Sequence, residues 1–161
     1  MADNVSFRTP SGGNPVNVVT ALKASLTSVA REDRLYAADR QKGRIIARTN
    51  RGIDFNGRQF TKYSPAYEKK RVKSGRSATV NLVWSGLMLQ ALVTRADPGS
   101  MDFTVGIYNK EGVRAAAHNS GEGHMPERRF VDASASDINE MAKDITERML
   151  ARANQTLLNA A

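Results

Sequence analysis

The sequence contains no cysteine, only two histidines and no apolar run as long as a membrane-spanning helix needs. Without cysteine, disulfide frameworks, thiolate nucleophiles and cysteine-based zinc sites are excluded. With His118 and His124 as the only histidines, a histidine-rich metal site is not expected. The N-terminus lacks the apolar segment of a signal peptide, which argues against secretion. A chain of 161 residues fits one compact domain, so we expect a soluble, basic protein.

The positive charge is concentrated in one stretch of the chain. The net charge is +8 at pH 7, and residues 40–76 hold 12 Lys and Arg against 2 Asp and Glu. Residues 77–161 hold 8 Lys and Arg against 10 Asp and Glu. A basic cluster of this kind attracts polyanions or an acidic protein surface. It indicates a nucleic acid or an acidic partner subunit, and the alternative is a solvated surface that keeps the protein soluble.

Nine cations of this stretch form the candidate surface for a partner or for DNA. They are interleaved with Phe60, Tyr63 and Tyr67, and alternating cations and aromatic rings can follow phosphates and stack on bases. At this loop spacing, Phe60 and Tyr63 also fit the commoner role of anchors that hold a loop on its own core. The nine cations are Arg44, Arg48, Arg58, Lys62, Lys69, Lys70, Arg71, Lys73 and Arg76.

The first third of the chain predicts an arm followed by helix. Residues 1–13 are rich in Gly, Ser and Pro and lack apolar periodicity, which predicts a flexible arm or one that a neighbour orders. Asn14 and Pro15 form a good helix start. One long helix or two successive helices are predicted over about residues 15–50, with Gly52 as the stop. The apolar stripe comprises Val18, Leu22, Leu26 and Val29, and more weakly Leu35, Ala38, Ile45 and Ile46.

Residues 52–81 predict an extended basic loop, because glycines and a proline interrupt any periodic pattern. A loop of this length within a small domain tends to be functional or interfacial. Its middle could form two helical turns that end near Arg71, with Ser64 as the cap and Pro65 in the first position.

The second half of the chain predicts short strands and helices. Residues 92–96 and 103–108 resemble two strands joined by a turn at 97–100, and the second strand alternates apolar and polar residues. A short helix capped by Ser85 is predicted over 87–92, a second over 113–118 ending at Gly121, and a further strand over 129–132.

A last helix completes the predicted fold. Ser134 or Ser136 caps it, and its apolar residues lie on one face. The whole pattern predicts an α+β class: a long N-terminal helix or helix pair, a small antiparallel sheet and a C-terminal helix. The arm over 1–13 would precede a single domain over 14–161. The apolar face of the last helix comprises Ile138, Met141, Ile145 and Met149.

No motif indicates catalysis. Ser85, His118 and Asp132 have the residue types of a triad, but no Gly-x-Ser-x-Gly motif surrounds Ser85. His118 and His124 do not have the spacing of a zinc site, and the chain has no phosphate-binding loop, dinucleotide fingerprint or calcium loop. We therefore expect no enzyme, no catalytic residue, no cofactor and no metal ion.

Five short motifs follow one another in the middle of the chain. They are Asp54-Phe55-Asn56-Gly57-Arg58-Gln59-Phe60, Leu82-Val83-Trp84-Ser85-Gly86-Leu87-Met88-Leu89-Gln90-Ala91-Leu92, Phe103-Thr104-Val105-Gly106, Ala115-Ala116-Ala117-His118-Asn119-Ser120-Gly121 and Met125-Pro126-Glu127-Arg128-Arg129-Phe130-Val131. In this order, over residues 54–132, the chain resembles the virion-morphogenesis or tail-completion proteins of tailed bacteriophages. The motif positions are Gly57, Phe60, Ser85, Gly86, Met88, Gly106, His118, Gly121, Pro126, Arg128 and Phe130.

The resemblance implies a structural protein of the phage neck or tail, without catalysis, that acts in tail completion or head–tail joining. It implies copies of the chain in a ring around the DNA channel, with six-fold symmetry favoured and twelve-fold possible. Its neighbours would be the portal or connector, or the tail-tube and terminator proteins, with genomic DNA passing non-specifically and no membrane. The protein would be assembled in the host cytoplasm and located in the virion.

A second interpretation remains open from the residues themselves. In it, the chain is a basic nucleic-acid-binding module whose binding surface is formed by residues 40–76.

Overall fold

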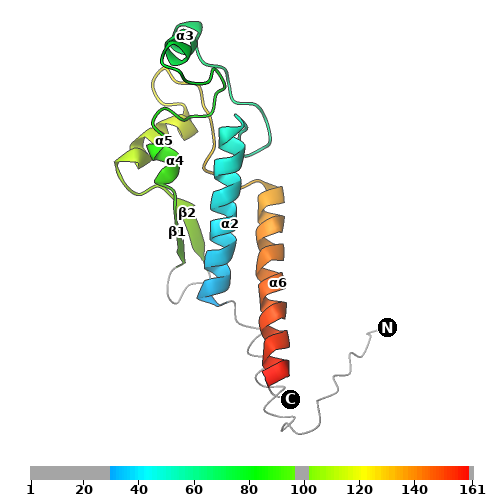
Figure 1. Cartoon of the computed structure of the whole chain (residues 1–161). Coiled ribbons are helices and arrows are strands. Elements are labelled where there is room, and N and C mark those ends of the chain that lie inside the picture. The colour runs from blue at the N-terminus through cyan, green and yellow to red at the C-terminus, as the bar shows by residue number, and fades with distance from the viewer. Residues whose placement is uncertain (1–29, 97–101, 160–161) are drawn as a thin grey trace.

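The computed structural model describes residues 30–96 and 102–159 (Figure 1). These residues contain helices and a small antiparallel sheet, which confirms the α+β class and the C-terminal helix. The predicted arm, the first part of the N-terminal helix and the turn at 97–100 lie outside the described residues. The elements are α2 (Arg31–Asn50), α3 (Pro65–Lys73), α4 (Leu87–Gln90), β1 (Val93–Ala96), β2 (Phe103–Gly106), α5 (Lys110–Ser120) and α6 (Ala135–Asn159).

Helix α2 is the central element of the described structure. Helix α6 runs antiparallel beside it, the β1–β2 hairpin packs on α2, and α4 packs on α5 near the C-terminal end of α2 (Figure 1). Helix α3 lies beyond that end, farthest from the C-terminal end of α6. None of the described helices combines the length and the apolar character of a membrane span.

The two predicted strands are confirmed as an antiparallel hairpin. Val93 pairs with Gly106 and Ala96 pairs with Phe103, so β2 ends two residues earlier than the alternating pattern indicates. The Tyr108 hydroxyl lies 3.0 Å from Thr104 Oγ1. A Cβ atom at Gly106 would lie 3.1 Å from the Tyr108 ring, so the glycine leaves the space that this ring fills.

Three predicted helix ends are confirmed by their hydrogen bonds. Ser64 Oγ accepts from the Tyr67 backbone N–H at 3.4 Å, so α3 begins at Pro65 as expected. Helix α5 ends at Gly121, which adopts the left-handed conformation with φ of +71°. At the start of α6, Ser134 Oγ accepts from the Asp137 N–H at 3.1 Å. Ser134 is therefore the cap.

The predicted loop over 52–81 has more order than its composition indicates. Its first part folds back on itself, because the Phe60 N–H donates to the Gly52 carbonyl at 2.8 Å and Ile53 bridges Gln59. Gly52 has φ of +79°, and a Cβ atom there would lie 3.0 Å from the Val80 carbonyl oxygen. Both ends of the segment are thus fixed against each other, and α3 stands between them.

The apolar core lies between the end of α2, α4, α5 and the loop ends. Phe130 is fully buried in it, and Phe60 confirms the anchoring role suggested for the loop aromatics. Tyr63 packs against this core while remaining partly exposed. The core residues are Ile45, Phe60, Val80, Leu82, Met88, Leu89, Leu92, Ala115 and Phe130.

The prediction of a strand over 129–132 is wrong. Within the described residues the sheet has two strands, and the segment instead pairs with one side chain. Asn119 Oδ1 accepts from the N–H groups of Phe130 at 3.0 Å and Val131 at 3.2 Å. Asn119 Nδ2 donates to the Val131 carbonyl at 2.9 Å. An amide side chain on α5 supplies the hydrogen bonds of a neighbouring strand, so the extended segment needs no strand partner.

The predicted apolar face of the last helix is only partly buried. Ile138 is 55% exposed, and the residues of α6 that are buried are Asp137, Asp144 and Ala153. Met141, Ile145 and Met149 are half-buried. The physical reason is that α2 presents arginines to α6, and carboxylates on α6 therefore take the central positions of the contact.

Candidate functional site

Three of the nine predicted surface cations point into the molecule. Arg44 Nη2 lies 2.8 Å from Asp144 Oδ2, and Arg48 Nη1 donates to Asp137 Oδ2 at 2.5 Å. These two residues join α2 to α6. Arg71 is 1% exposed and belongs to the interior of the loop region.

The other six cations lie on or near the surface. Arg76 is half-buried, and its Nε donates to the Trp84 carbonyl at 2.9 Å. The remaining five are exposed, and three of them project from α3. The six are Arg58, Lys62, Lys69, Lys70, Lys73 and Arg76.

The buried Arg71 guanidinium is held by neutral groups. Its Nε donates to the Ser77 carbonyl and its Nη1 to the Val83 carbonyl, each at 3.0 Å. Its Nη2 donates to Asn81 Oδ1 at 3.1 Å. Arg71 thereby ties α3 to the returning segment, and no described carboxylate pairs with its charge.

Arg128 is likewise a buried arginine whose guanidinium is held by neutral carbonyl groups. It is 4% exposed, and it donates from Nε to the Thr61 carbonyl at 2.9 Å and from Nη2 to the Lys62 carbonyl at 3.2 Å. The guanidinium carbons of Arg71 and Arg128 lie 4.9 Å and 5.1 Å from the centre of the Tyr63 ring. Two buried cations therefore share one aromatic ring.

Tyr63, Tyr67 and Trp84 form a row of three aromatic rings in contact. Tyr67 contacts Tyr63 edge-on with centroids 5.0 Å apart and stacks on Trp84 at 6.0 Å. The Arg76 guanidinium lies 4.1 Å from the centre of the Trp84 ring. The sequence pattern indicated Tyr63 and Tyr67 but not Trp84, because the apolar run over 82–84 resembles core. Trp84 is 41% exposed.

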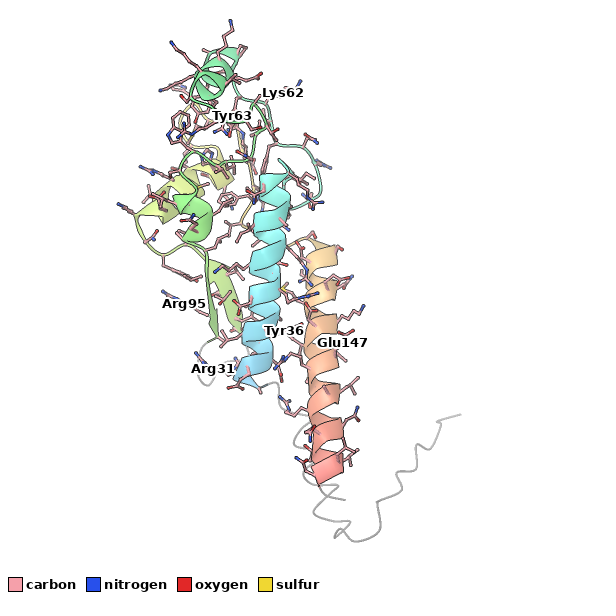
Figure 2. The ribbon with its side chains drawn as sticks, viewed as in Figure 1. Arg31, Tyr36, Lys62, Tyr63, Arg95 and Glu147 are labelled. Carbon is pink, nitrogen blue, oxygen red and sulfur yellow. The ribbon has the colours of Figure 1, made fainter. Side chains whose placement is uncertain are left out.

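These groups border a pocket of about 370 Å³ between the start of α3, the end of α5 and the segment before Phe130. Figure 2 shows Lys62 and Tyr63 on the stretch that leads into α3, beyond the end of α2 opposite to Arg31. None of the twelve lining residues is acidic. They are Lys62, Tyr63, Ser64, Tyr67, Arg71, Leu82, Trp84, His118, His124, Met125, Pro126 and Arg128.

His118 brings a buried polar atom to the pocket. Its Nδ1 has no hydrogen-bond partner among the described residues. Burial, together with the charge of Arg128, lowers the pKa of His118 below its usual value, so the imidazole is neutral at pH 7. Burial raises the pKa of the Tyr63 hydroxyl although Arg71 acts in the opposite direction, so the phenol keeps its proton.

The motif positions divide into three groups. Phe60, Met88 and Phe130 belong to the core, while His118, Pro126 and Arg128 line the pocket. The remaining five shape turns and element ends: Gly57, Gly86 and Gly121 have positive φ, Gly106 accommodates the Tyr108 ring, and Ser85 Oγ accepts from the Leu87 N–H.

The described residues do not assemble the chemistry of a triad or a metal site. Ser85 Oγ accepts from the Leu87 N–H, while Asp132 accepts from the Ala133 N–H and from Arg129. Within the described residues, no hydrogen bond joins Ser85 or Asp132 to His118. Across residues 30–96 and 102–159, no group of three or more metal-ligating side chains could hold an ion.

We find no family model that matches the chain, and no curated protein or solved structure that matches it significantly.

Proposed function

We propose that this chain is a structural, non-catalytic subunit of the neck or tail junction of a tailed bacteriophage, acting in tail completion or head–tail joining. The observation that carries the proposal is the convergence of the motif positions. Phe60, Met88 and Phe130 come from three separate motifs and belong to one core. Gly121 ends α5 where a Cβ atom would lie 2.8 Å from the Glu127 backbone nitrogen. The order of motifs that carries the resemblance thus corresponds to a single folded unit.

In this proposal each copy contacts the next through different patches, so that rotation closes a ring around the DNA channel. The arm over 1–13 and the loop over 52–81 contact the neighbours. Several large apolar side chains on α4, β1, α5 and the link between β2 and α5 support a role in contacts, because they are exposed. These are Leu87, Val93, Tyr108 and Val113.

The experiment compares assembly of two charge-reversed variants. Lys69 and Lys73 are one helical turn apart on α3 and exposed, so Lys69→Glu with Lys73→Glu reverses the basic surface without removing an internal contact. The matched control is Lys110→Glu with Lys143→Glu, which changes the net charge equally on exposed positions of α5 and α6. Arg71 is left unchanged because it is buried.

We expect the unchanged protein to join head and tail proteins of its phage in a ring-sized complex by native mass spectrometry. The α3 variant should assemble at least about tenfold less, corresponding to about 1.4 kcal/mol, and the control should assemble normally. A protein that stays monomeric in the presence of those components, and whose α3 variant behaves like the control, would contradict the proposal.

The alternative function is a basic nucleic-acid-binding module, favoured by the exposed cations of α3 beside Tyr67 and Trp84. It predicts that the isolated protein binds duplex DNA with an affinity that falls steeply with salt. The same α3 variant would then lose DNA binding while assembly is unaffected. Fluorescence anisotropy at several salt concentrations distinguishes the two functions.

A further inference from the structure

The pocket beside Tyr63 carries positive charge without acidic compensation. Lys62, Arg71 and Arg128 line it, and no lining residue is Asp or Glu. Arg71 and Arg128 are buried and bonded only to neutral oxygens. Removing a charge from water is costly, and neutral dipoles offset that cost less than a counter-ion does. An anion in the pocket would therefore be stabilised.

Polar atoms without described partners lie at this pocket. Arg128 uses Nε and Nη2 for the carbonyls of Thr61 and Lys62, and its Nη1 makes no hydrogen bond within the described part of the chain. His118 Nδ1 is buried at the same pocket and also lacks a described partner. The exposed Lys62 lines the same pocket, so the three residues come from three separate segments of the chain.

The remaining walls of the pocket are apolar side chains and aromatic rings that already contact other side chains. Leu82, Met125 and Pro126 supply apolar surface. Tyr63 carries two guanidinium groups over its ring, and Trp84 carries Arg76 at 4.1 Å and stacks on Tyr67. A nucleobase that stacked on Tyr63 or Trp84 would compete with these contacts. An aliphatic side chain next to a carboxylate fits such walls without displacing a cation from a ring.

We propose that this pocket binds an acidic segment of a partner protein, with a carboxylate on Arg128 and Lys62 and a neighbouring aliphatic side chain against Leu82 and Met125. The inference rests on the proposed function in treating the pocket as a contact with another protein. It does not require that the chain forms a ring. The pocket volume of about 370 Å³ admits a short stretch of side chains.

Trp84 makes the pocket directly observable. It is the single tryptophan of the chain, and it lines the pocket, so intrinsic fluorescence reports on occupancy at this place. The full chain is titrated with acetyl-Leu-Glu-Leu-Glu-amide, with acetyl-Leu-Gln-Leu-Gln-amide, with inorganic phosphate and with a thymidine octanucleotide. We expect a saturable change with the glutamate peptide and binding at least about tenfold tighter than that of the glutamine peptide.

The variant Lys62→Glu tests the assignment without removing an internal contact of the side chain, because Lys62 is exposed. It should weaken binding of the glutamate peptide at least about tenfold, while Lys110→Glu, with the same charge change on α5, should leave binding unchanged. Arg128→Lys should also weaken binding, and circular dichroism verifies that this variant is folded.

Three results would overturn the inference: equal binding of the two peptides, tighter binding of phosphate or the oligonucleotide, or equal effects of Lys62→Glu and Lys110→Glu. The two proposals fail separately. If complexes assemble but the fluorescence titration shows no preference for the glutamate peptide, only the pocket assignment fails. If the peptide binds and no complex assembles, only the neck or tail function fails.

Discussion

The Asn119 side chain forms hydrogen bonds with the backbone of Phe130 and Val131 at distances of 2.9–3.2 Å. These bonds satisfy two N–H groups and one carbonyl that a sheet would otherwise pair. Because Phe130 is fully buried next to these groups, water could not easily take the place of the Asn119 side chain as their partner. At the scale of single residues, Asn119 therefore determines how the segment that contains Phe130 and Val131 is held on α5.

We predict that Asn119→Ala lowers the free energy of unfolding by about 2–4 kcal/mol, because it leaves three partly buried backbone groups without partners. Asn119→Asp keeps the acceptor but loses the donor to the Val131 carbonyl, so it should also destabilise. Urea denaturation measures both. The control is Asn139→Ala on the exposed surface of α6. A loss below about 1 kcal/mol for Asn119→Ala would contradict this role.

At the scale of elements, the contact between α2 and α6 depends on ion pairs. Asp33 near the start of α2 pairs with Arg148 and Arg152, and Arg48 near its end pairs with Asp137. Burial acts to raise the pKa of Asp137, but the hydrogen bonds from the Ser134 N–H and from Arg48 lower it by more. The pKa of Asp137 therefore lies below its usual value. A native pKa below the unfolded one means that the carboxylate stabilises the fold above about pH 4.

We predict that Asp137→Asn lowers the free energy of unfolding at pH 7 by about 3 kcal/mol, because Arg48 loses a buried counter-charge. The difference from the unchanged protein should shrink as the pH falls below about 4, through the native pKa of Asp137. Urea denaturation at pH 7 and at lower pH measures this difference.

Glu140→Gln is the matched control, since Glu140 is an exposed residue 3.8 Å from Arg44 and should contribute less than about 1 kcal/mol. A pH-independent difference for Asp137→Asn would show that capping and shape, and not charge, cause the loss.

At the scale of the whole molecule, the apolar core lies at one end of the α2–α6 pair. Ile45 contributes to the core from the end of α2, whereas the start of α2 meets α6 through Asp33. Leu150 and Leu158, on the C-terminal half of α6, are exposed. The described structure therefore has a well-packed end that carries the pocket and a more polar end that a neighbour could cover.

We predict that the amides of α6 after Leu150 exchange with solvent at least about tenfold faster than those around Ile45, because few apolar contacts from the described residues protect them. Hydrogen–deuterium exchange followed by mass spectrometry measures both in one sample. In an assembled complex the difference should decrease if α6 contacts a neighbour. Equal protection of both regions in the isolated protein would contradict the polar-end interpretation.

Local features of this protein could be predicted from the sequence. Ser64, Ser134 and Gly121 mark helix ends because hydroxyl caps and left-handed glycines act through bonds to residues a few positions away. The hairpin strands were predictable for a similar reason, since alternation reflects which side of a strand is covered. The anchoring role of Phe60 also followed from residue type and position.

Only the tertiary structure decided the composition of the pocket and of the α2–α6 contact. Arg71 and Arg128 are as basic in sequence as any surface cation, and their burial results from carbonyl groups on other segments. Trp84 stacks on Tyr67, which is remote in the sequence, and the Asn119 side chain makes the hydrogen bonds that a neighbouring strand would make. Charge and periodicity describe the residue that carries them, whereas the position of a charged or aromatic side chain is determined by partners that are remote in the chain.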